Sequence, residues 1–217
     1  LYRHWVDPMI PFAAAIKPQA HGVAITSAIL RDGTKDEEKN WHTALTRSGA
    51  KYLSNSPILE KFSSPFNYKD QTKILVITDV RKDDMDQVAS AYEALFKASN
   101  GGGIGLFTAI SRLKKIHEKI VTSLSHKNIP LYAQHVDAMD TGTLIDIFRN
   151  EKNSCLLGTD AIRDGVDVPG ESLRMLVFDR VPWPRPNIMH KHRREKFGGK
   201  DYDDMLTRLK LKQAYGR

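Results

Sequence analysis

Several features that mark other classes of protein are missing from this sequence. Among 217 residues there is a single cysteine, Cys155, so no disulfide can form within the chain, nor can several of its cysteines hold a metal cluster. No apolar run approaches the ~18 residues that a membrane-spanning helix needs. The first residues, Leu1–Trp5, are not followed by the apolar core of a secretory signal. We therefore expect a protein of the reducing cytoplasm with no membrane partner.

The motifs of several enzyme classes are missing as well. The sequence has no Walker A pattern, so it has no visible means of gripping the β and γ phosphates of a nucleotide by itself. It has no His-Glu-x-x-His, no paired cysteines and no Gly-x-Ser-x-Gly, so we expect neither a metal site nor an acyl-transfer nucleophile. The formal net charge of +7 permits a nucleic-acid partner without proving one.

Short apolar runs alternate with longer segments of helical periodicity. The runs typical of buried strands are Val23–Thr26, Lys73–Thr78, Ile104–Thr108, Leu131–Ala133, Ser154–Gly158 and Met175–Asp179. The helical segments are Met85–Ser99, Ala109–Leu124, Gly142–Asn150 and Asp203–Gly216, with a shorter one at Trp41–Tyr52. This alternation predicts an α/β fold with a mainly parallel sheet sandwiched by helices.

The composition changes near residue 68. Ser54–Tyr68 is rich in Ser, Pro and Asn, which is typical of a loop. We therefore expect residues 1–68 to form a leader and residues 69–217 to form the compact α/β unit. Because the sequence begins with Leu1 and ends at Arg217 in a helical segment, we also expect it to be a piece of a longer protein.

Three stretches allow both a functional and a structural interpretation. The Gly- and Asp-rich run Thr159–Gly170 follows a predicted strand, where ligands gather in open α/β sheets, but turn-forming residues in a solvated loop explain it equally well. The basic cluster His190–Lys196, preceded by Trp183, could hold phosphates and a base, although a solvated helix face is slightly favoured. Gly101–Gly103 precedes a strand instead of following one, which indicates a flexible turn and not a phosphate loop.

Four short motifs stand in a recognisable order. Thr26–Leu30 resembles helicase motif III with Ile29 in place of Thr, and Phe107–Ala109 resembles motif IV with Ala109 in place of Ser. Leu157–Gly170 resembles motif V, in which Arg163 and Asp164 replace the usual Trp and Glu. Gln213–Arg217 is similar to the first half of motif VI, Gln-x-x-Gly-Arg. Together, over nearly the whole chain, they resemble the C-terminal part of DinG/XPD-type DNA helicases of superfamily 2.

The resemblance implies a second RecA-like motor domain of the P-loop NTPase type, without the half that carries Walker A. That half would be the first motor domain of the same polypeptide, and in DinG-type members it can also hold an iron–sulfur cluster. The full-length protein would use ATP with Mg²⁺ to move along single-stranded DNA, in the context of DNA repair. This chain alone is expected to be inactive and to bind no metal.

The resemblance also assigns roles to individual residues. Arg217 would be an arginine finger on the γ-phosphate, a contact worth ~10³–10⁵ in rate in other phosphoryl-transfer systems, and Gln213 would orient near the nucleotide. The ATP-binding residues would be Gly165, Asp167, Asp164 and Gly216. The DNA-binding residues would be Thr108, Arg112, Thr159 and Arg193. Thr26 and Ser27 would couple the two activities.

Other functions stay open at this point. A non-enzymatic module that binds single-stranded nucleic acid could keep a motor-like fold, and the departures in motifs III, IV and V suit a degenerate helicase with weak activity. A small-molecule α/β enzyme would need a nucleophile and a base, for which the sequence offers no candidate pair.

Overall fold

The computed structural model describes residues 4–165, 167–168 and 170–216, and of Asp164 and Gly165 it describes only the backbone. The chain divides into two compact units. One unit comprises Leu1–Leu75 and Trp183–Lys212, and the other comprises Val76–Pro182 and Gln213–Arg217. The predicted boundary at residue 68 rests on loop composition and stays a prediction about the domains of the full-length protein.

The second unit is built on a four-stranded sheet with the order β2-β3-β1-β4. The strands are β1 (Gly103–Leu106), β2 (Leu131–Ala133), β3 (Cys155–Gly158) and β4 (Met175–Phe178). Every neighbouring pair is parallel, with Leu106 opposite both Gly158 and Phe178. All four strands therefore finish at the same edge of the sheet, and the predicted parallel α/β fold is confirmed.

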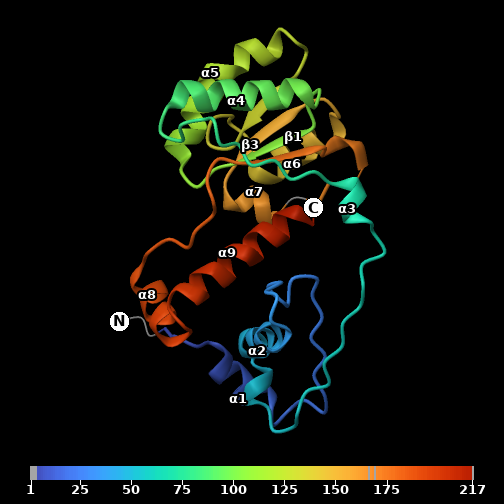
Figure 1. Cartoon of the computed structure of the whole chain (residues 1–217), viewed down its shortest axis with the longest axis vertical. Helices are drawn as coiled ribbons and strands as arrows, with labels where there is room; N and C mark the ends of the chain where they lie inside the picture. The colour runs from blue at the N-terminus through green and yellow to red at the C-terminus, as the bar shows by residue number, and fades with distance from the viewer. Residues whose placement is uncertain (1–3, 166, 169, 217) are drawn as a thin grey trace. The chain divides into compact units, whose positions relative to one another are not determined.

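Helices cover both faces of this sheet (Figure 1). The first face packs against α4 (Met85–Ala98) and α5 (Ile110–Ser125), and the second against α6 (Thr141–Asn150) and α7 (Asp160–Gly165). Side chains alternate along each strand as the pleat requires. In β3, Leu157 belongs to the first core cluster and Leu156 to the second, and both are fully buried.

Aspartate caps mark where α4 and α6 begin. The Asp84 carboxylate accepts hydrogen bonds from the backbone N–H groups of Asp86 and Gln87 at the start of α4. Asp140 does the same for Gly142 and Thr143 at the start of α6. These bonds satisfy donors that a helix leaves unpaired in its first turn, so each helix begins where the sequence supplies an aspartate.

The glycine-rich turn between α4 and β1 lies at the amino end of the sheet. Arg174 holds it, donating to the carbonyl oxygens of Ser99 (3.1 Å) and Asn100 (2.7 Å). Gly101 has a φ of +76°, and a Cβ there would meet the Asn153 carbonyl oxygen at 2.0 Å. The predicted helix-to-strand turn is thus confirmed, and glycine is needed at position 101 because the backbone passes so close to Asn153.

The first unit is helical. It contains α1 (Met9–Ile16), α2 (Glu37–Ser48), the 3₁₀ turn η1 (Ala50–Tyr52), α3 (Tyr68–Gln71), α8 (Ile188–Lys196) and residues 200–212 of α9 (Lys200–Tyr215). Asp36 caps α2, which therefore begins before the predicted Trp41. The buried Asp32 carboxylate accepts from Arg208 (Nε to Oδ2, 3.0 Å), which fastens residues far apart in the sequence.

Two predicted strands were wrong. Val23–Thr26 and Lys73–Thr78 have no regular secondary structure, and the side chains of Ile74 and Val76 are each 80% exposed. A strand exists only through hydrogen bonds to a neighbouring strand, which local β-propensity cannot supply. Among the helices that the structure describes, none is long and apolar enough to cross a membrane.

Candidate functional site

Polar side chains gather at the edge where the four parallel strands end. Gln134, Thr159 and Asp179 directly follow β2, β3 and β4, and Thr108 comes two residues after β1. The ladder continues one step beyond the strands, because Gln134 N donates to Leu157 O (2.9 Å) and Asp179 N donates to Leu106 O (3.0 Å). The carboxyl edge is where open α/β sheets bind their ligands.

Thr159 is held by the side chain of Gln134. The Gln134 Oε1 atom accepts from the Thr159 backbone N (3.0 Å) and from its hydroxyl Oγ1 (2.8 Å). On the other side, Gln134 Nε2 donates to the hydroxyl of Thr141, the first residue of α6 (3.0 Å). One buried amide therefore connects the ends of β2 and β3 with the start of a helix.

The turn from β3 into α7 is tight. The Thr159 carbonyl accepts from Ile162 N (3.0 Å) and Arg163 N (3.2 Å). A Cβ at Gly158 would meet Ile162 Cγ1 at 2.2 Å, so only glycine fits there. Arg163 is buried, and its Nη1 atom forms an ion pair with the Asp160 carboxylate (2.8 Å).

The rest of the motif V loop is anchored through its backbone. Arg149 donates from Nη2 (3.1 Å) and Nε (3.3 Å) to the carbonyl oxygen of Asp167. Asp167 itself is exposed, and Val168 beside it is only 1% exposed. This arrangement leaves the Asp167 carboxylate accessible. For Asp164 and Gly165, the other two predicted ATP-binding positions here, the structure describes only the backbone.

The predicted motif VI begins beside the motif V loop. Ala214 is buried in the same core cluster as Ile162 and Val168. Gln213 is half-buried and Gly216 is exposed. The predicted arginine finger, Arg217, lies outside the described residues. Residues from motifs V and VI that are distant in sequence therefore pack together.

Arg112 and Asp179 form an ion pair after β4, the edge strand on the other side of the sheet from β2. Arg112 donates from Nε (2.8 Å) and Nη2 (2.7 Å) to the two oxygens of Asp179, whose side chain is fully buried. This hydrogen bonding raises the pKa of Arg112 above its ordinary value. Thr108, the other predicted DNA contact from this part of the chain, is half-buried.

The remaining predicted residues belong to the first unit. Arg193, on α8, is half-buried and donates from Nε to the Val6 carbonyl oxygen (3.0 Å). Thr26 and Ser27 are exposed, and Ser27 Oγ accepts from Ile29 N (3.1 Å). The structure therefore groups motifs IV, V and VI in one unit and leaves these three residues in the other.

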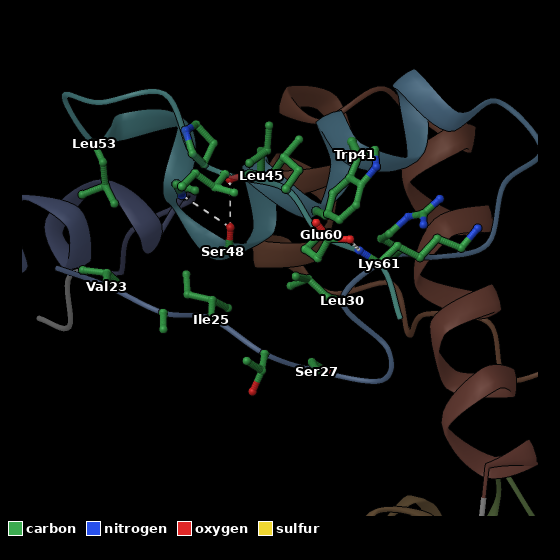
Figure 2. A pocket seen from close by; sticks show the side chains of 18 of the residues that line it. Val23, Ile25, Ser27, Leu30, Trp41, Leu45, Ser48, Leu53, Glu60 and Lys61 are labelled. Atoms are coloured by element: carbon green, nitrogen blue, oxygen red, sulfur yellow. Dashed lines mark hydrogen bonds between the residues drawn. The ribbon is translucent and has the colours of Figure 1, made fainter. Parts of the chain in front are cut away.

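Thr26 and Ser27 line a hollow of about 1420 Å³. Figure 2 shows Val23, Ile25 and Leu30 along one side of it, with Leu45 and Ser48 of α2 opposite. Small-molecule sites usually measure ~300–1,000 Å³, so this hollow is larger than such a site needs. Within the described parts of the chain, no group of three or more His, Cys, Asp or Glu side chains could hold a metal ion.

Sequence reasoning missed Gln134, Arg149 and Asp179. A signal for two of them was available, because Gln134 and Asp179 are polar residues placed directly after buried strands. Arg149 gave no such signal, since it lies on α6 and reaches the motif V loop only in the fold.

Comparison with known families identifies the domain. Residues 92–217 match the helicase C-terminal domain family. The chain belongs to this family. Its four-stranded parallel sheet, with helices on both faces, is the RecA-like α/β arrangement that the sequence predicts.

Similar proteins come from several bacteria. This domain is 28% identical over 169 residues to a protein of Bacillus subtilis named 3'-5' exonuclease DinG, covering 74% of this chain and 18% of the relative. It is 31% identical over 129 residues to the ATP-dependent helicase DinG of Mycobacterium tuberculosis, covering 57% of this chain and 19% of the relative. It is 26% identical over 165 residues to the ATP-dependent DNA helicase YoaA of Escherichia coli, covering 71% of this chain and 25% of the relative. The chain thus spans a quarter or less of the length of these relatives. The family match and these similarities together support a C-terminal helicase domain of the DinG type.

Proposed function

We propose that this chain is the second motor domain of an ATP-dependent DNA helicase. In this role it completes an ATP site whose Walker A half belongs to the missing first motor domain, and it grips single-stranded DNA. The proposal includes action in DNA repair in the cytoplasm. The observation that carries it is the burial of Ala214 against Ile162 and Val168, because this brings the residues that match motifs V and VI into one place.

The roles of the ATP-binding residues follow from charge and accessibility. Asp167 is exposed, so its carboxylate can accept a hydrogen bond from a ribose hydroxyl or from Arg217. Gly165, Asp164 and Gly216 would line the same part of the site. Gln213 would orient near the nucleotide, and Arg217 would stabilise negative charge developing on the γ-phosphate. Mg²⁺ would be held with the phosphates by the first motor domain, which would also carry any iron–sulfur cluster.

The DNA grip would come from the carboxyl edge of the sheet. Thr108 and Thr159 offer hydroxyl and backbone donors that suit phosphate oxygens and carry no sequence preference. Arg112 and Arg193 add positive charge, but each already donates from Nε to a partner in the chain. Thr26 and Ser27 would couple ATP hydrolysis to movement of the domain.

Duplex unwinding by the full-length protein tests the proposal. A duplex with a single-stranded tail should be separated when ATP and Mg²⁺ are present and should stay intact when ATP is omitted. The 217-residue chain alone should hydrolyse no ATP. Turnover by the chain alone would contradict the assignment of Walker A to the missing half.

A degenerate motor is the second candidate, and two substitutions favour it. Ile29 and Ala109 each lack a hydroxyl that the family's motifs III and IV usually supply. If the full-length protein binds single-stranded DNA in a salt-sensitive way but neither hydrolyses ATP nor unwinds the duplex, the chain is part of a binding module instead.

A further inference from the structure

We infer that the side-chain oxygen of Gln134 takes the place of a DNA phosphate oxygen as the hydrogen-bond acceptor of Thr159. Thr159 must break these hydrogen bonds in order to bind DNA. The inference rests on the proposed function, in which Thr159 contacts the DNA backbone. It concerns a residue outside the recognised motifs, at the end of β2.

The orientation of the Gln134 amide is fixed by its partners. The Thr159 backbone N–H can only donate, so the atom of Gln134 that lies 3.0 Å away must be the oxygen. The amide nitrogen therefore points to the Thr141 hydroxyl at 3.0 Å. The assignment needs no choice between the two ends of the amide.

Both donors of Thr159 converge on this one oxygen. The backbone N–H and the hydroxyl approach Gln134 Oε1 at 3.0 and 2.8 Å. A hydroxyl has one proton, so while Thr159 donates it to Gln134 only lone pairs remain for another partner. A phosphate oxygen accepts and cannot donate, so it has no hydrogen bond to make with Thr159 in this state.

The same pair of donors would suit a phosphate oxygen that took the place of the amide oxygen. Gln134 is only 7% exposed, so DNA cannot reach the Thr159 donors from the Gln134 side while the amide stays in place. Binding therefore requires that Thr159 turns its hydroxyl away from Gln134 or that the amide withdraws. Interactions made only in the free state oppose binding. Gln134 should thus lower the affinity for DNA.

The direction in which two substitutions change the affinity for DNA tests this role in the full-length protein. Gln134→Leu removes the competing acceptor at similar volume, and Gln134→Glu replaces it with a stronger one. Binding of a fluorescein-labelled oligothymidine strand should become about three- to tenfold tighter with Gln134→Leu, corresponding to the loss of about one hydrogen bond. It should become weaker with Gln134→Glu.

The salt dependence separates this role from a general change in charge. Gln134→Leu alters no charge, so the slope of log affinity against log salt should equal that of the wild-type protein. Weaker binding with Gln134→Leu, in a variant whose thermal unfolding matches the wild type, would overturn the inference and make Gln134 a support for Thr159. If that variant unfolds early, tighter or unchanged binding with Gln134→Glu overturns it as well.

A Thr159→Val variant distinguishes the failure of this inference from failure of the proposed function. If Thr159 contacts DNA, the variant binds oligothymidine more weakly, and adding Gln134→Leu changes its affinity less than it changes the wild type. Unchanged binding by Thr159→Val would remove Thr159 from the DNA site. Weaker binding by Thr159→Val, with a full Gln134→Leu effect in both backgrounds, would instead leave the DNA site standing and refute competition for the hydroxyl.

Discussion

Arg112 binds the fully buried carboxylate of Asp179 through two hydrogen bonds of 2.8 and 2.7 Å. The pair joins α5 to the residue directly after β4, so it ties a helix to the carboxyl edge of the sheet. Its geometry is the fork that arginine presents to a carboxylate.

Substitution of Arg112 by Met should therefore destabilise the domain strongly. It leaves the Asp179 carboxylate buried without a cation, and breaking such a pair costs about 3–5 kcal/mol. We expect urea unfolding to report this loss. The double variant Arg112→Met with Asp179→Asn should recover part of it, since the uncompensated charge is then gone. Equal stability of the wild type and Arg112→Met would contradict the structural role of the pair.

Gly158→Ala should damage the turn that carries motif V. The new Cβ would lie 2.2 Å from Ile162 Cγ1, so α7 would have to move. Overpacking of this kind costs about 1–3 kcal/mol. Gly22→Ala is the control, because a Cβ at Gly22 meets nothing within 4 Å. Thermal unfolding should show a lower midpoint for Gly158→Ala alone, and equal midpoints for the two variants would refute the steric argument.

Cys155 should be chemically inert while the domain is folded. It is fully buried in β3, and burial raises the pKa of its thiol to about 12. The thiolate, which is the reactive form, is therefore scarce at pH 8. Peptide mapping after treatment with iodoacetamide should find Cys155 unmodified in the native protein and modified after denaturation in guanidinium. Rapid modification of the native protein would show that β3 is not buried as described.

The Tyr52 hydroxyl should make the first unit sensitive to alkali. Its hydrogen bond to Asp7 raises the pKa of Tyr52 from 10.0 to about 12. The raised pKa means that the protonated phenol is favoured in the folded state. The stability that it supplies is complete below pH ~10 and is lost as the pH rises towards 12.

The difference between the ultraviolet titrations of the wild type and of Tyr52→Phe measures this ionisation. It should isolate one phenol with a midpoint near pH 12, where the cited pKa places it. A midpoint near pH 10, the ordinary value, would mean that Tyr52 does not bind Asp7.

The sequence predicts the strands of the sheet well, but it predicts poorly which side chains meet at the carboxyl edge. Leu131–Ala133 and the other three buried runs of the second unit are strands because each pairs with a neighbouring strand of the sheet. Val23–Thr26 has the same local composition but has no partner strand among the described residues, and pairing is a property of the fold.

In the candidate site, too, local patterns could be predicted from the sequence and contacts between strands could not. Motif V could be found because Gly158 and Thr159 have a fixed local spacing, and the tight turn into α7 requires the glycine. The position of Gln134 directly after a buried strand marks it only as a polar residue at the edge of the sheet, because its bond to Thr159 depends on a register that places the end of β2 beside the end of β3. Interactions across strands are therefore what the structure adds to the sequence.

We propose above that this chain completes the ATP site of a helicase, with Arg217 as its arginine finger. The most direct test is ATP hydrolysis by the full-length protein, stimulated by single-stranded DNA, with Arg217→Ala compared with the wild type. We expect DNA-stimulated turnover in the wild type and a loss of about 10³-fold or more in the variant, as for other arginine fingers. The exposed Arg185→Ala, outside the matched motifs, serves as the control and should keep its activity. Stimulated turnover that survives in Arg217→Ala would contradict the role of Arg217 in the ATP site.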